Sequence, residues 1–295
     1  MFDSQISVIP GSRASVGEGA WWDAHRQCLW SVDIRGRVIM RSDRQSTAIA
    51  CRTPGLACAV ATAQNDHLVV ALDDALYLWH PERDHGPRRW TAPSDHPDTY
   101  RFNDMTIDPA GRIIIGTMQR SELGPAPNGV VYSVERGRWR RLLDGFMTIN
   151  GLAFSADGKR MFWSDSHPSV NRIWSASYDA GSGTLGDPQP FVEMRNYSGR
   201  PDGGACDSEG GYWTAAIGGG CLHRFGADGS LDKTLDMPVD HPTKPVFGGA
   251  DLRTMFVTSL SVLPSTDPAR AAIAGAVLRI EGPGRGFGLA NAVTG

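Results

Sequence analysis

The sequence contains no long apolar segment. A membrane-spanning helix needs about 20 consecutive, mostly apolar residues, and no stretch of this chain approaches that length. Residues 1–20 have neither a basic start nor a continuous apolar core, so they do not match a secretory signal peptide. We therefore expect a soluble chain that is not exported and has no membrane partner.

Cysteines are few and show no pairing pattern. The chain has five, an odd number, and no two of them have the C-x-x-C spacing. Both features argue against a disulfide framework and against a thiolate metal site, and they predict a reducing, cytoplasmic location. The five residues are Cys28, Cys51, Cys58, Cys206 and Cys221.

The sequence also lacks an excess of charge. The formal net charge is -3 and no run of like charges occurs, which argues against a nucleic-acid-binding or membrane-surface protein. By contrast, turn-forming residues are abundant, with 35 Gly and 19 Pro. This composition favours short strands over long helices, and a small neutral or anionic molecule as the partner.

A short apolar strand recurs six times along the chain, and each copy follows a turn. The starts of the copies are 39, 45, 48, 51 and 43 residues apart, about the length of one four-stranded propeller blade. Asp and Gly supply the turn chemistry, as in DPAGR (108–112) and DSEGG (207–211). The copies are LWSVDI from Leu29, LVVALD from Leu68, IIIGTM from Ile113, MFWSDS from Met161, YWTAAI from Tyr212 and MFVTSL from Met255.

Six such units use nearly the whole chain and predict an all-β fold. Further apolar stretches before each turn and after each copy make the unit a four-stranded antiparallel meander. The predicted architecture is one domain over residues 1–295, a six-bladed β-propeller in which a strand around Ile6 to Ile9 completes the last blade. A linear β-solenoid is the alternative, but the chain has no obvious polar capping repeats at its ends.

One position of the repeat carries side chains suited to a metal. The innermost strands of a propeller line a central channel, so equivalent positions converge on one axis. Two carboxylates and two amides there suit a hard cation such as Ca²⁺, Mg²⁺ or Mn²⁺, and Zn²⁺ or Fe²⁺ are also compatible. The alternative is ordinary Asn-Gly and Asp-Gly turn chemistry, which does not require a shared register. The four residues are Glu18, Asn103, Asn150 and Asp202, and Cys58 and Lys244 hold the other two positions.

Around these positions the sequence resembles the senescence marker protein, regucalcin and gluconolactonase family of six-bladed lactonases. The resemblance extends from about residue 15 to residue 282. Two departures occur: Ala20 stands where Pro is frequent, and Arg200 stands where an aromatic residue is common and could alter the pocket rim. The segments that carry the resemblance are GEGAWW (17–22), RFNDMTIDPAGR (101–112), IGTM (115–118), NGLAFSADGK (150–159), RPDGGACDSEGGYW (200–213) and KPVFGGADLRTMFVTS (244–259).

The resemblance implies a set of roles for these residues. One divalent metal would be held by Glu18, Asn150 and Asp202, while Arg101 and Asn103 would face the substrate. The implied reaction opens the ester ring of aldonolactones to aldonic acids in sugar catabolism. Asp202 is the first candidate for the general base that deprotonates the attacking water. In the alternative, the metal generates hydroxide and Asp202 is a ligand only.

Two other functions stay open at this point. One is a metal-dependent esterase or phosphotriesterase on the same fold, and the other is a non-catalytic calcium-binding or interaction propeller. Neither the particular lactone, the metal nor the oligomeric state follows from the sequence. The predicted loop 91–100 adds His96 and Tyr100 as candidate pocket residues, and Gln119 and Glu122 follow the third repeat. Lys244 either adds a positive group to the channel or points to solvent.

Overall fold

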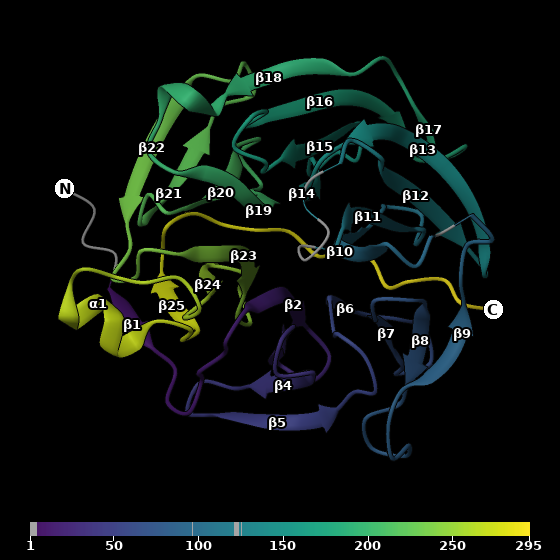
Figure 1. Cartoon of the computed structure of the whole chain (residues 1–295), viewed down its shortest axis with the longest axis horizontal. Helices are drawn as coiled ribbons and strands as arrows, with labels where there is room; N and C mark the ends of the chain where they lie inside the picture. The colour runs from purple at the N-terminus through teal and green to yellow at the C-terminus, as the bar shows by residue number, and fades with distance from the viewer. Residues whose placement is uncertain (1–4, 96, 121–123, 125) are drawn as a thin grey trace.

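The computed structural model describes residues 5–95, 97–120, 124 and 126–295. Six antiparallel sheets stand as blades around a ring, which confirms the predicted all-β, six-bladed propeller (Figure 1). The first strand of each blade is innermost, and the chain visits the blades in order. Helical structure in the described residues is limited to a 3₁₀ turn, Met194–Asn196, and one short helix, α1, Pro268–Ile273.

The strands of the first three blades follow one another without crossovers. Blade 1 comprises β2 (Gly17–Asp23), β3 (Cys28–Asp33), β4 (Val38–Ser42) and β5 (Thr47–Arg52). Blade 2 comprises β6 (Ala59–Thr62), β7 (Leu68–Ala71), β8 (Leu76–Trp79) and β9 (Arg88–Thr91). Blade 3 comprises β10 (Tyr100–Ile107), β11 (Ile113–Gln119), β12 (Gly129–Glu135) and β13 (Arg138–Phe146).

The last three blades repeat the pattern with small additions. Blade 4 comprises β14 (Ile149–Phe154), β15 (Arg160–Asp165), β16 (Arg172–Asp179) and β18 (Gln189–Glu193), and the short β17 (Thr184–Leu185) also pairs with β16. Blade 5 comprises β19 (Arg200–Cys206), β20 (Tyr212–Ile217), β21 (Cys221–Phe225) and β22 (Leu231–Asp236). Blade 6 comprises β23 (Pro242–Gly248), β24 (Thr254–Ser259), β25 (Leu278–Glu281) and β1 (Ile6–Val8).

Blade 6 closes the ring by combining both ends of the chain. The strand β1 pairs antiparallel with β25, with Ile6 opposite Ile280 and Val8 opposite Leu278. The predicted N-terminal strand therefore completes the last blade, as expected. Such closure pairs a strand edge that would otherwise be open to other chains.

The second strands of the blades carry large, fully buried side chains. Trp30, Trp163 and Trp213 are at most 1% exposed and belong to the apolar clusters of the ring. Burying an aromatic side chain of this size removes 150–250 Å² of surface from water. The apolar repeat seen in the sequence is thus the core of the ring.

The Asp residues in the predicted turns anchor the hairpins between the first and second strands. In blade 5, Oδ1 of Asp207 accepts from the backbone N of Gly211 (2.8 Å), and Oδ2 accepts from Nε1 of Trp213 (2.8 Å) and Nε of Arg224 (2.7 Å). Blade 1 repeats the arrangement, with Asp23 accepting from Nε1 of Trp30 (3.1 Å). In blades 1 and 5 the turn aspartate therefore also ties the hairpin to its core tryptophan.

Replacing Asp207 by asparagine is expected to destabilise the ring. The change leaves the buried guanidinium of Arg224 without its buried carboxylate, and breaking a buried ion pair costs about 3–5 kcal/mol. The free energy of unfolding from denaturant titration measures this effect. Asp228→Asn at an exposed turn of the same blade is the matched control and should change little; equal losses in both variants would contradict the assigned role.

The C-terminal segment, residues 283–293, crosses the end of the channel where these hairpin turns lie. It is the yellow trace that runs across the middle of the ring in Figure 1. Its backbone hydrogen-bonds to four blades at or beside these turns, at Leu252, Ser208, Thr62 and Gly111. The start of each innermost strand is therefore at the opposite end of the channel from this segment.

Candidate active site in the channel

A β-bulge interrupts the innermost strand of five of the six blades at the same level of the channel. In blades 1, 3, 4, 5 and 6, two residues of the first strand stand opposite one residue of the second. Bulges re-aim side chains and are common beside active sites. The pairing in blade 2 is regular along its first strand. At this level blade 2 has Cys58, whose side chain carries no oxygen that could bind a metal. In blades 1 and 4 the bulge follows Glu18 and Asn150, each of which is followed by a glycine. In blades 3, 5 and 6 the bulge follows Phe102, Pro201 and Pro242.

The glycines in two of these bulges have a geometric reason. Gly19 has φ +60° and Gly151 has φ +64°, a region that glycine enters without steric cost. A side chain at Gly151 would also lie 2.4 Å from the hydroxyl of Tyr212. The Asn-Gly and Glu-Gly pairs are thus required by the bulge, and they place Glu18 and Asn150 at the channel level of the other polar residues.

Glu18 and Asp202 bring two carboxyl groups into the channel from blades 1 and 5. Burial raises the pKa of Asp202 well above its ordinary value, and the negative charges of Glu18 and Asp104 add to the shift. Burial also raises the pKa of Glu18 to about 7, with a further contribution from Asp104 and an opposing one from Lys244. Two acidic groups that disfavour each other's ionisation are well suited to share a cation.

Asn150 lies in β14 and is held by hydrogen bonds on both sides of its amide. Its Oδ1 accepts from Nδ2 of Asn103 (2.7 Å), and its Nδ2 donates to Oγ of Ser166 (2.7 Å). Ser166 in turn donates to the carbonyl of Pro201, directly before Asp202. Blades 3, 4 and 5 are therefore linked by one chain of hydrogen bonds, which fixes the orientation of the Asn150 oxygen.

Arg101 and Asn103 lie together in β10 of blade 3. Nη1 of Arg101 donates to Oδ1 of Asn103 (2.8 Å) and to the carbonyl of Phe102 (2.8 Å). Asn103 uses Nδ2 for Asn150 and for the carbonyl of Ile149 (2.9 Å). Both side chains are half-buried, so Arg101 retains further donors for a ligand, while Asn103 also orients Asn150.

Lys244 points into the channel and not to solvent. Its side chain is buried, and Nζ pairs with the carboxylate of Asp104. Cys58, at the equivalent position of blade 2, is also buried, and burial raises the pKa of its thiol to about 11. The thiol is therefore protonated at neutral pH and is a poor metal ligand.

The residues present fit a divalent cation with oxygen ligands. Among the described residues, no three His, Cys, Asp or Glu side chains gather in a metal-binding arrangement, so a third protein donor beside Glu18 and Asp202 would be a neutral oxygen such as that of an amide. Asn150 meets this need, because its oxygen is oriented by Asn103 and Ser166. Carboxylate and amide oxygens are the ligands that hard cations prefer.

Several residues of the site were not singled out by the sequence pattern. Asp104 and Ser166 are both buried, and the only sequence signal for either is its place next to a residue or strand already identified.

Arg200, which the sequence did single out, donates to the carbonyl of Ser166 (2.8 Å), and its charge lowers the pKa of Asp202. Tyr100 donates to Oε1 of Gln119 (3.3 Å). The candidates His96 and Glu122 lie outside the described residues.

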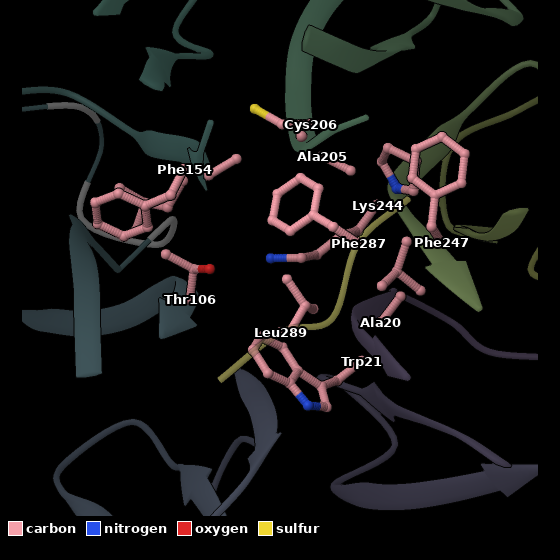
Figure 2. Close-up of a pocket in the computed structure, with 15 residues that line it drawn as sticks. Ala20, Trp21, Thr106, Phe154, Ala205, Cys206, Lys244, Phe247, Phe287 and Leu289 are labelled. Atoms are coloured by element: carbon pink, nitrogen blue, oxygen red, sulfur yellow. The ribbon is translucent and has the colours of Figure 1, made fainter. Parts of the chain in front are cut away.

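A small apolar cavity of about 40 Å³ occupies the channel between the polar residues and the C-terminal segment (Figure 2). Its lining residues on the innermost strands lie in or directly after the bulges, and the C-terminal segment adds Phe287 and Leu289. Figure 2 shows the amino group of Lys244 projecting toward Thr106 across this space. The polar residues and the apolar cavity thus meet at Lys244.

Comparison with known proteins agrees with the fold and the motifs. Residues 16–261 match the model of the SMP-30/Gluconolactonase/LRE-like region. The chain is 30% identical to a pentonolactonase of Haloferax volcanii over 86% of this chain and 84% of that one. It is 31% identical to regucalcin of Gallus gallus, covering 96% of both chains.

A solved structure gives the same result. The crystal structure of a calcium-binding protein, regucalcin, from Agrobacterium tumefaciens superposes with a TM-score of 0.84 and 25% identity, covering 95% of this chain and 96% of that one. No helix of the described residues is both long and apolar enough to cross a bilayer. With its matched region, its relatives and its six blades in agreement, this chain belongs to the SMP-30/gluconolactonase/LRE-like family.

Proposed function

We propose that this protein is a lactonase that hydrolyses sugar lactones to aldonic acids with one divalent metal ion held by Glu18, Asn150 and Asp202. The observation that carries the proposal is the pair of carboxyl groups from blades 1 and 5 with raised pKa values, together with an oriented amide oxygen from the neighbouring blade 4. The names of the relatives support the substrate class, because they include a pentonolactonase and an L-arabinolactonase. Family membership alone does not specify the substrate.

The bound cation would polarise the lactone carbonyl, an effect worth several kcal/mol. Asp202 would accept a proton from the attacking water at a carboxylate oxygen. Burial raises the pKa of Asp202 and strengthens it as a base, whereas a bound cation would lower that pKa and weaken it. In the other reading Asp202 only holds the metal. The two readings differ in the acidic limb of kcat against pH, because that limb reports the group that must lose a proton before the water attacks. An acidic limb that stays in place when one divalent cation is exchanged for another assigns the proton to Asp202. An acidic limb that moves with the cation assigns it to a water activated by the cation.

Arg101 and Asn103 would bind the hydroxyl and ring oxygens of the sugar. The planar guanidinium of Arg101 offers several donors, and two contacts of its Nη1 already fix its position beside Asn103. An aryl ester or phosphotriester would instead favour apolar and aromatic walls. The apolar cavity of this channel lies beyond Lys244, on the side of the C-terminal segment, which supports the polar substrate.

Replacing Arg101 by alanine is expected to raise KM more than it lowers kcat. The lost hydrogen bonds hold the substrate in both the ground state and the transition state, so binding suffers most. Initial rates over a range of lactone concentrations measure both constants, with an expected rise in KM of about tenfold for one to two kcal/mol. Arg120→Ala, outside the proposed ligand and substrate set, is the control. A fall in kcat at unchanged KM would contradict the binding role.

The test of the proposed function is proton release from lactones by protein stripped with EDTA, before and after Ca²⁺, Mn²⁺, Zn²⁺ or Fe²⁺ is restored. D-Glucono- and L-arabinonolactones represent the proposed substrates, and phenyl acetate and paraoxon represent the alternative hydrolases. Metal-restored turnover of a sugar lactone supports the proposal. Folded protein that turns over no lactone with any metal would favour the esterase or the non-catalytic calcium-binding propeller.

We also propose a cytoplasmic location and a single domain over residues 1–295. All five cysteines are free and buried, which suits a reducing compartment. The proposed partner is the small sugar lactone alone, without nucleic acid or membrane, because the net charge is only -3.

A further inference from the structure

A buried ion pair spans the channel beside the proposed metal ligands. Lys244 belongs to β23 of blade 6 and Asp104 to β10 of blade 3, which face each other across the ring (Figure 1). Nζ of Lys244 donates to Oδ1 of Asp104 and to the carbonyl of Met105 (3.1 Å). The two residues are 5% and 4% exposed. A charge so deeply buried is stable only when it is paired.

Both oxygens of Asp104 are engaged within the protein. Oδ1 also accepts from the backbone N of Met105 (2.8 Å), and Oδ2 accepts from the backbone N of Leu152 in blade 4 (2.9 Å). Asp104 nevertheless belongs to the electrostatic surroundings of the site, because its charge acts on both Glu18 and Asp202. It is therefore a third carboxylate near the proposed metal that is held in other contacts.

Lys244 also packs directly against the backbone that carries Asp202. A Cβ added at Gly203 would lie 2.7 Å from both Cβ and Cγ of Lys244 and 2.8 Å from its Cα. Only a glycine after Asp202 permits this approach, since real Cβ atoms do not come so close. The lysine stem thus lies against one ligand segment while its amino group neutralises the neighbouring carboxylate.

We propose that Lys244 is a positioning residue of the metal site, which keeps Asp104 from acting on the cation and leaves two carboxylates to hold it. This inference rests on the proposed function. Affinity for hard cations rises with the number of carboxylates in reach. A site with two carboxylates binds more weakly and leaves room for a substrate carbonyl, whereas a site with three would bind the cation too firmly and block that position.

The charges predict effects of opposite sign on metal affinity. Lys244→Met removes the cation that neutralises Asp104 and leaves an uncompensated negative charge beside the site, so the Kd for a divalent cation should fall about tenfold. Asp104→Asn leaves an unpaired lysine cation beside the site, so the Kd should rise about tenfold. The double variant Lys244→Met/Asp104→Asn removes both charges, and its Kd should return to within about threefold of the wild-type value.

The experiment is calorimetric titration of Ca²⁺, and in a second series Mn²⁺, into EDTA-stripped full-length protein of each variant. A purely structural role for the pair would lower the melting temperature of both single variants and leave Kd unchanged, which would overturn the inference. If Lys244→Met does not fold, Asp104→Asn and the double variant still decide, because only the inference predicts weaker binding that the second substitution restores. Wild-type protein that binds neither ion would overturn the proposed metal site itself. Equal Kd values in all variants would instead overturn only the positioning role of Lys244.

Discussion

Replacing Asp202 by asparagine is expected to lower kcat/KM for a sugar lactone by about three powers of ten. The change keeps the volume of the side chain but removes one of the two carboxylates proposed to hold the cation, together with the proposed proton acceptor. A loss of several kcal/mol of transition-state stabilisation corresponds to about a thousandfold in rate, since about 1.4 kcal/mol is tenfold. Glu18→Gln removes the other carboxylate and should have a similar effect. Initial rates of proton release at saturating metal measure both.

The folded state of these variants provides the first control. Asp202 is 6% exposed and its pKa is raised, so an uncharged side chain at this position costs the metal-free fold nothing in electrostatic energy. Metal-free Asp202→Asn should therefore melt no lower than metal-free wild type. Asp187→Asn at an exposed position is the matched control and should keep full activity. Asp202→Asn that retains a tenth or more of wild-type activity would refute the assigned role.

Metal-free protein is expected to lose stability as the pH rises through about 7, and a bound cation should restore it. The pKa of Glu18 is raised from 4.5 to about 7, and that of Asp202 is raised as well. A carboxyl whose pKa is higher in the folded state stabilises the fold below its ordinary pKa, and this contribution is lost as the pH passes the folded-state value. The melting temperature without metal should therefore fall between about pH 5 and pH 8.

The effect of the cation has a predictable size. A ligand at one hundred times its Kd stabilises the native state by about 2.7 kcal/mol, which raises the melting temperature of a protein of this size by about 5 °C. The gain should grow with pH because ionised carboxylates bind the cation. Differential scanning calorimetry with and without Ca²⁺ measures it. The double variant Glu18→Gln/Asp202→Asn is the control and should show neither the fall nor the rescue. A metal-free melting temperature that rises over this pH range would contradict the assignment.

Much of the fold is local in origin, which is why it could be predicted from the sequence. The Asp-Gly turns, the apolar second strands and the interval between repeats all involve residues close in the chain, such as Asp207 with Gly211 and Trp213. The repeat also predicted a shared level of the channel for Glu18, Asn150 and Asp202, because equivalent positions of a closed ring share one axis. The conformations of Gly19 and Gly151 follow from the same motifs.

Other features of the site depend on contacts between residues far apart in the chain. Lys244 meets Asp104 across 140 positions of sequence, and nothing around Lys244 indicates whether its side chain enters the channel. The link from Asn150 through Ser166 to Pro201 likewise joins two blades. The crossing of the hairpin turns by residues 283–293 has no counterpart in the repeat.

By itself, the sequence determined the number of blades, the strand order within each and the residue types that face the channel, because periodic hydrophobicity and turn chemistry act over a few neighbouring residues. Only the tertiary structure decided which charges neutralise each other, how far burial raises the pKa of Glu18 and Asp202, and which end of the channel the C-terminal segment covers. These properties depend on distances and desolvation in the closed ring. Such quantities exist only after strands from opposite blades have been brought together.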